Sequence, residues 1–391
     1  IDRAQANNDL LPDTVGLTGQ AGEYLDGKWY GGLYGWTWPH GFYNLQFAAL
    51  SAAQCALLLT NDPTYLDLPR KQQARILALG VLRSLDELRG QMSLAAHWIG
   101  ISNAVKQDSG DSRTFVVPYR YGDKGWFDYQ PLPPMYPAAL WTMSLAEQDW
   151  ASLELLRSQS NYDWRTVYPF HNKEDAGHEP PWLEFLSGRN PTYPEEILRA
   201  SLGQVYWRLD RIRGDNADLT AIYIHHWQER NPVTTEALIQ LTLGAPQLIY
   251  NGGLLVAPLR YFDAIRQRPG LPPDVAALVT AVGEAALALT LVNLHPLAAR
   301  TVLLQAGSFG EHEFGEARYI GCGAASLYPF AEANYTYAAS LYTQPDPLPT
   351  EYHEPVDSQY LAIELPPATE IKVTLTLRRH VHPARYGVPW A

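Results

Sequence analysis

The chain has 391 residues, and its 29 Lys and Arg against 41 Asp and Glu give a net charge of −12. This acidic balance argues against a nucleic-acid-binding protein, because a phosphate backbone requires a basic face. A hydrophobic content of 46% excludes a disordered chain,, and no apolar run reaches the roughly 20 residues that a membrane-spanning helix needs.

The first two thirds of the chain carry helical periodicity. Apolar residues recur at three- and four-residue spacing, and prolines open two of the segments, which suits a first helical turn. Long loops rich in glycine and aromatic residues separate these segments. The pattern predicts a helical domain over residues 1–270, with helices at Tyr43–Thr60, Gln73–Arg89, Pro137–Ser158, Pro194–Arg213 and Val233–Leu243.

Beyond Pro272 the pattern changes from helical to strand periodicity. After a short predicted helix at Pro273–Val282, the sequence predicts strands at Leu287–Asn293, Thr301–Gln305, Tyr360–Leu365 and Ile371–Leu377. The last segment alternates strictly between apolar and polar residues, which is typical of a half-buried strand. Since only a short proline-containing turn separates the last two strands, we expect them to be antiparallel neighbours. The expected domain is an antiparallel β-sandwich over residues 285–391.

The aromatic residues are concentrated in loops of the helical region. Eleven of the twelve tryptophans lie between Trp29 and Trp227. Aromatic faces stack on sugar rings, so these loops indicate a sugar-binding groove, although the same aromatics could instead fill the interior of the loops. The substrate-binding candidates are Trp29, Tyr30, Trp36, Trp38, Asn44, Arg120, Tyr121, Asp123, Trp126, Trp182, Trp227 and Asn251.

Several common catalytic motifs are absent from the sequence. There is no GxSxG nucleophile elbow and no HExxH zinc motif,. The histidines do not have metal-ligand spacing, so we predict no metal and no cofactor. The remaining possibilities are carboxylate chemistry and chemistry based on His or Tyr.

Carboxylate chemistry fits glycoside hydrolysis, which requires two Asp or Glu residues on either side of the scissile bond. The candidates are Asp128, Asp175, Glu179 and Glu236. Glu179 is favoured because it lies between His178 and a rigid Pro-Pro pair, with Trp182 next to them. A carboxyl beside an indole in a dry groove has a raised pKa, which suits a general acid. For any single carboxylate, an ion pair with a nearby cation is a commoner role than catalysis.

A polysaccharide lyase would use the same groove differently. Such an enzyme abstracts the proton α to a uronate carboxyl with Tyr or His, while Asn or Arg neutralises the carboxylate. His40, Tyr43 and His225 are the candidates for this chemistry.

Three segments carry a resemblance to a known class: GKWYGGLYGWTWPHG, VVPYRYGDKGWFDYQP and HHWQERNPVTTEALIQLTLGAPQLIYNGG. They resemble bacterial α/α-toroid carbohydrate-active enzymes, over about Asp13 to Tyr261. The resemblance implies a mainly α, then β chain: an (α/α) toroid-like helical domain followed by a C-terminal antiparallel β-sandwich. A complete toroid has twelve helices and the sequence shows about six, so we expect missing helices upstream of Ile1.

The resemblance also implies the activity. The leading expectation is a secreted or periplasmic glycoside hydrolase that cleaves a uronic-acid-containing polysaccharide or oligosaccharide without a cofactor. A polysaccharide lyase is the first alternative, and a non-catalytic sugar-binding protein is the second.

Overall fold

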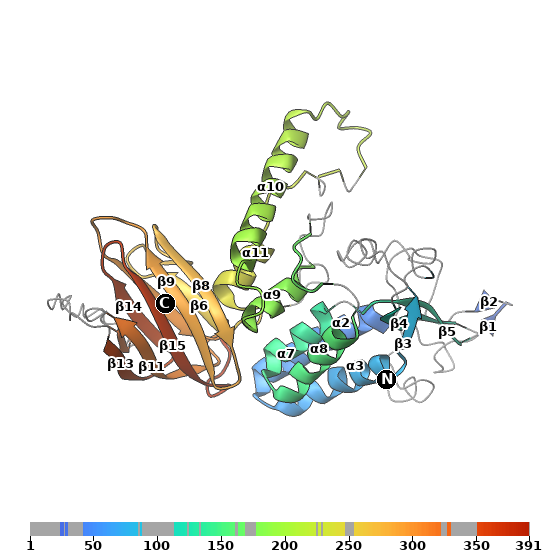
Figure 1. Cartoon of the computed structure of the whole chain (residues 1–391), viewed down its shortest axis with the longest axis horizontal. Coiled ribbons are helices and arrows are strands. Elements are labelled where there is room, and N and C mark those ends of the chain that lie inside the picture. The colour runs from blue at the N-terminus through green and yellow to red at the C-terminus, as the bar shows by residue number, and fades with distance from the viewer. Residues whose placement is uncertain are drawn as a thin grey trace.

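The computed structural model describes residues 24–26, 28–29, 42–84, 87, 113–122, 125–132, 134–160, 163–168, 177–223, 226–227, 230–246, 254–321, 327–329 and 350–390. Figure 1 shows two lobes joined by a small group of helices, with one long helix projecting from that group. The N-terminal lobe contains helices and a small sheet, and the C-terminal lobe is a sandwich of two sheets.

Four helices form the body of the N-terminal lobe: α2 (Phe42–Thr60), α3 (Asp67–Ala78), α7 (Met135–Ser144) and α8 (Glu147–Gln159). A 3₁₀ turn, η1 (Pro63–Leu66), joins α2 to α3, and Asp62 caps it by accepting a hydrogen bond from the Thr64 backbone N–H at 2.9 Å,. The helices bury Leu50, Leu57, Ile76 and Trp141 in one core.

Strands accompany these helices. A short hairpin pairs β1 (Tyr24–Leu25) with β2 (Lys28–Trp29), and an antiparallel sheet has the order β3 (Val81–Ser84), β4 (Arg113–Gly122), β5 (Gly125–Gln130). The predicted helix Gln73–Arg89 is therefore wrong in its second half. Pairing of Val81 with Val116 in β4 holds this segment extended, so a tertiary contact overrides its helical spacing.

The predicted helix Pro137–Ser158 is two helices. Leu145 takes a left-handed conformation (φ 51°) and its N–H donates to the Trp141 carbonyl, which ends α7. Ala146 is extended, and α8 begins at Glu147. The left-handed residue allows the chain to turn back, so α8 packs on α7 (Figure 1),.

A second group of helices lies between the lobes: α9 (Glu179–Leu186), α10 (Tyr193–Arg213), α11 (Glu236–Leu238) and a π-helical turn, η2 (Ile239–Leu243). Gly244 ends η2 with φ 65°, and a Cβ at this position would lie 2.9 Å from Val279 Cγ1. Glycine therefore satisfies both the conformation and the close packing of η2 on the sandwich.

The sandwich consists of two five-stranded antiparallel sheets, ordered β12-β14-β10-β6-β7 and β13-β11-β15-β9-β8. Their inward-facing residues form a core separate from that of the N-terminal lobe. The strands are β6 (Leu259–Asp263), β7 (Arg268–Pro269), β8 (Val275–Val282), β9 (Ala286–Asn293), β10 (Arg300–Ala306), β11 (Glu313–Gly321), β12 (Leu327–Pro329), β13 (Thr350–Ser358), β14 (Tyr360–Leu365) and β15 (Glu370–Arg378).

Two expectations for this lobe are corrected. The predicted helix Pro273–Val282 is strand β8, which pairs with β9. The strands β14 and β15 are not neighbours, because the turn between them carries the chain from one sheet to the other. Asn293 fixes this crossing: its Nδ2 donates to the carbonyls of Leu365 (3.1 Å) and Pro366 (2.9 Å), while its backbone N–H bonds to Thr369.

The predicted helical toroid is wrong. In the described part of the chain, strands β3, β4 and β5 interrupt the helical series, and the sheets account for much of the structure. Helix α10 projects away from α2, α3, α7 and α8 instead of joining them in a ring (Figure 1). Helical spacing identified several helices, but it carried no information on how they close around one another.

The lobes are also joined by Arg379, which follows β15. Its guanidinium donates to the carbonyls of Met143 and Ser144 at the C-terminus of α7. These carbonyls have no partner within the helix, and the helix dipole favours a cation there.

No helix within the described ranges is long and apolar enough to cross a membrane.

Candidate acid–base site

The site is built at the N-terminus of α9. His178 precedes this helix, Glu179 is its first residue, and Pro180 and Pro181 follow in the first turn. Prolines are tolerated here because the first N–H groups of a helix have no intrahelical acceptor. The start of the helix is therefore rigid, and it fixes Glu179 in a position where only 1% of its surface is exposed.

Glu236, the first residue of α11, lies against this helix start. Its Oε1 accepts a hydrogen bond from the His178 backbone N–H at 2.9 Å, and its Oε2 lies 2.7 Å from His178 Nδ1. On the other side of the imidazole, Nε2 lies 2.8 Å from the Tyr168 carbonyl oxygen. Both ring nitrogens thus face acceptors, so both carry protons and His178 is an imidazolium.

Electrostatics agree with this assignment. Burial lowers the pKa of His178, but the negative charge of Glu236 and the hydrogen bonds to Glu236 and Tyr168 outweigh burial, and the net shift is upward. Glu236 is completely buried. A buried carboxylate needs such a partner, since an unpaired ion in the interior is costly.

The pKa of Glu179 is also raised, and at neutral pH its side chain keeps its proton. Burial, followed by repulsion from Glu236, raises the pKa of Glu179 to about 8. Its Oε1 has no hydrogen-bond partner among the described residues. At neutral pH Glu179 is therefore a neutral carboxylic acid, and it lies beside the hydrogen-bonded pair of Glu236 and His178,.

Two further side chains complete the cluster. Tyr193, at the start of α10, donates its hydroxyl to Gln240 Oε1, and Gln240 Nε2 donates to Glu236 Oε1 at 3.3 Å. Burial raises the pKa of Tyr193 well above its usual value, so the hydroxyl remains protonated. Neither residue was predicted from the sequence. Gln240 could have been found from its four-residue spacing from Glu236 on a helix, whereas no sequence feature singles out Tyr193.

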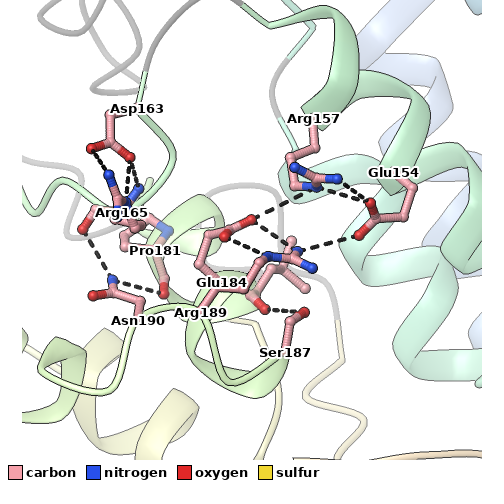
Figure 2. A network of polar contacts seen from close by, with 10 residues as sticks. Glu154, Arg157, Asp163, Arg165, Pro181, Glu184, Ser187, Arg189 and Asn190 are labelled. Carbon is pink, nitrogen blue, oxygen red and sulfur yellow. Dashed lines mark hydrogen bonds and ion pairs between the residues drawn. The ribbon is translucent and has the colours of Figure 1, made fainter.

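A network of polar contacts holds α9 in place (Figure 2). Glu184 accepts hydrogen bonds from Arg189 at 2.7 and 3.0 Å, and Glu154 on α8 forms ion pairs with Arg157 and Arg189 at 2.7 and 3.3 Å. Asn190 Nδ2 donates to the carbonyls of Arg165 (3.0 Å) and Pro181 (3.4 Å). These contacts tie the helix carrying Glu179 to α8 and to the segment that provides Tyr168.

The predicted aromatic residues lie in different environments. Trp182 is fully buried in the core, with its ring 6.5 Å from that of Trp141. Trp126 is half-buried against the same core, and Trp227 is 56% exposed. These three do not form one common surface. Trp182 supports α9 from within the core.

For the remaining predicted site residues, the structure describes at most the backbone. Trp29 lies in β2, Tyr43 and Asn44 in α2, Arg120 and Tyr121 in β4, and Asp128 in β5, but their side chains are outside the described part of the structure. The following predicted residues lie wholly outside the described residues: Tyr30, Trp36, Trp38, His40, Asp123, Asp175, His225 and Asn251. Of the predicted catalytic residues, the structure brings Glu179 and Glu236 together.

No group of three His, Cys, Asp or Glu side chains in the described ranges is arranged to hold a metal ion. The cluster around Glu179 instead has the composition of a proton-transfer site. Its groups are a neutral acid, a carboxylate, an imidazolium and two neutral hydrogen-bonding side chains.

Comparison with known proteins gives a family for the chain. Residues 1–239 match a domain of unknown function, DUF8034, and no curated protein matches. The match includes His178, Glu179, Tyr193 and Glu236, and it covers more than half of the 391 residues. The chain therefore belongs to the DUF8034 family.

Proposed function

We propose that the protein is a glycoside hydrolase in which Glu179 is the general acid and Glu236 is the second catalytic carboxylate. The observation that supports this proposal is a pair of neighbouring buried carboxyl groups with different partners: Glu236 is hydrogen-bonded to His178, whereas Glu179 Oε1 has no hydrogen-bond partner among the described residues. Glu179 is kept neutral by burial and by repulsion from Glu236, whereas Glu236 is bound to the His178 imidazolium.

Glycoside hydrolysis uses such a pair. One carboxylic acid protonates the leaving-group oxygen, and the second carboxylate acts as a nucleophile or activates a water molecule. Two carboxyl groups in different surroundings can take these two different roles. Glu179, with its pKa of about 8, retains its proton at neutral pH and can donate it to the leaving group.

The supporting residues have positioning roles. His178 holds Glu236 through two hydrogen bonds, and Gln240 links Glu236 to Tyr193. Both carboxyl groups are closed off from solvent, so the proposal requires the site to open when substrate binds. Closing again around the substrate would keep the proton of Glu179 from exchanging with bulk water.

The described cluster favours a hydrolase over a lyase. A lyase needs a Tyr or His that accepts a proton. Tyr193 is unsuitable because burial raises the pKa of its hydroxyl. His178 is unsuitable because both of its ring nitrogens already donate hydrogen bonds. The proposed substrate class is a uronic-acid-containing polysaccharide or oligosaccharide.

The experiment is to incubate the protein with a panel of uronate-containing and neutral polysaccharides and to measure reducing ends and unsaturated-uronate absorbance in parallel. Reducing ends without absorbance are expected. Growth of absorbance would show a lyase, and binding of a glycan by calorimetry without new reducing ends would show a sugar-binding protein. Either result would overturn the proposal.

A further inference from the structure

Helix α10 has one face that packs within the molecule. Its buried residues, Tyr193, Ile197, Ser201, Gln204 and Arg208, recur every three or four residues along that face. Arg208 Nη1 donates to the Asn231 carbonyl at 2.6 Å. The segment that returns toward α11 therefore covers this side of the helix.

The opposite face of α10 is apolar and exposed. Leu198, Leu202 and Tyr206 follow one another at four-residue intervals and are 41%, 56% and 65% exposed. Four-residue spacing places them in one stripe along the helix. Figure 1 shows α10 extending away from both lobes, and the exposed fractions of the three side chains show that the stripe is open to solvent. A contiguous exposed apolar surface is typical of a protein–protein contact.

At each end of the stripe an acidic residue precedes a basic residue along the chain. At the N-terminal end, Glu195 forms an ion pair with Arg199 at 2.6 Å. At the C-terminal end, Arg213 forms an ion pair with Asp210 at 2.8 Å. Glu195 and Arg213 are exposed and each lies nine residues from Gln204, at the middle of the helix. At 3.6 residues per turn they lie on the same side of the helix, in line with the stripe.

This arrangement is complementary to itself when one copy is reversed. In an antiparallel pair centred on Gln204, Glu195 of one copy is level with Arg213 of the other, and Arg199 is level with Leu209, one residue from Asp210. Leu202 of one copy lies opposite Tyr206 of the other, so the two apolar stripes coincide. Antiparallel pairing also sets the two helix dipoles in opposite directions, which is the favourable arrangement.

We propose that the protein forms a two-fold symmetric dimer in which α10 packs antiparallel against α10 of a second copy. A second copy fits better than an acidic or a basic partner, because each end of the stripe carries both signs and a reversed copy presents the opposite sign to each of them. The interface is isologous, so both copies use the same surface. Apolar burial supplies the affinity, whereas the exposed ion pairs fix the antiparallel orientation.

The first test is sedimentation velocity of the whole chain over a range of concentrations. The expected result is a monomer–dimer equilibrium that Leu202→Glu shifts toward monomer by at least a factor of about 10 in Kd, since a charge would be buried in the apolar centre. Leu297→Glu is the matched control, because Leu297 is 86% exposed but lies in the sandwich. Circular dichroism melts establish that both variants fold.

The second test uses charge reversal and tests orientation. One variant carries Glu195→Lys, and the other carries Arg213→Glu. Each variant alone is expected to dimerise more weakly than the wild type, because like charges then face each other at both ends. Mixing the two variants restores opposite charges at both ends and is expected to give a heterodimer.

Three results would overturn the proposal. These are a chain that is monomeric at every concentration, a dimer that Leu202→Glu leaves unchanged, and charge variants that do not recombine on mixing. None of these results depends on the catalytic proposal, since the stripe on α10 contains none of the residues assigned to catalysis.

Discussion

Glu236 binds His178 at two points, accepting one hydrogen bond from its backbone N–H and another from its ring Nδ1. These two residues are 58 positions apart in the sequence, yet they join the start of α11 to the start of α9. The contact places the Glu236 charge next to Glu179, and that proximity contributes to the raised pKa of Glu179. The stability and the proposed chemistry of the site both depend on this pair.

The first prediction concerns the pH dependence of stability. The pKa of Glu179 is raised in the folded protein from 4.5 to about 8. Between these pH values the folded state keeps the proton while the unfolded chain releases it, so the free energy of unfolding falls as pH rises. The raised pKa of His178 acts in the same direction: its contribution is complete below pH 6.5 and is lost as pH rises through its folded value.

Urea unfolding measured from pH 4.5 to 8 tests this dependence. Glu179→Gln is neutral at every pH, so this variant should show a smaller fall in the free energy of unfolding than the wild type. Equal slopes for the two proteins would show that Glu179 titrates normally in the folded state.

The second prediction is that His178→Ala destabilises the protein by about 3–5 kcal/mol, because Glu236 is then a buried charge without a counter-ion. Adding Glu236→Gln should recover much of this loss, since the amide carries no charge. A double-mutant cycle by urea unfolding measures the coupling. Additive effects of the two substitutions would contradict the ion pair.

The third prediction concerns Tyr193, whose ring is buried and whose hydroxyl donates to Gln240 Oε1. Tyr193→Phe should cost about 1–3 kcal/mol, because the amide oxygen of Gln240 loses its donor in a dry environment. Tyr206→Phe is the matched control, since Tyr206 is 65% exposed. A similar loss from both substitutions, measured by urea unfolding, would exclude a special role for the Tyr193 hydroxyl.

The fourth prediction concerns the contact between the lobes. Arg379 donates to the carbonyls of Met143 and Ser144, and burial lowers its pKa to about 10. Arg379→Ala should destabilise the docked lobes by about 1.5–3 kcal/mol, the usual contribution of hydrogen bonds from a charged group. Scanning calorimetry should then show the single unfolding transition broaden or split. An unchanged transition would show that the lobes are held together elsewhere.

Local patterns in the sequence predicted the isolated elements better than their assembly. Helix α10 and strand β15 follow the ranges expected from three- to four-residue and two-residue periodicity. Val81–Ser84 and Val275–Val282 were misassigned as helix, because both are short apolar segments that acquire their conformation from pairing with β4 and β9,. The toroid failed for a related reason, since helical periodicity does not specify how helices pack.

The candidate site was partly accessible from sequence. Glu179 and Glu236 were both named as candidates, but nothing local indicated that α9 and α11 would bring them together. Trp182 was expected to line a groove beside Glu179, whereas it is fully buried in the core against Trp141. A Trp beside a catalytic candidate can support the helix from within as readily as it can contact a ligand.

The most direct test of the proposed function compares Glu179→Gln with Glu184→Gln in reducing-end assays on the polysaccharide that the wild type cleaves. Both substitutions change a buried Glu on α9 to its amide, but Glu184 pairs with Arg189 (Figure 2). The account predicts that Glu179→Gln lowers kcat by about 10²–10⁴-fold, while Glu184→Gln retains wild-type kcat per folded molecule. Wild-type turnover by Glu179→Gln would contradict the assignment of Glu179 as the general acid.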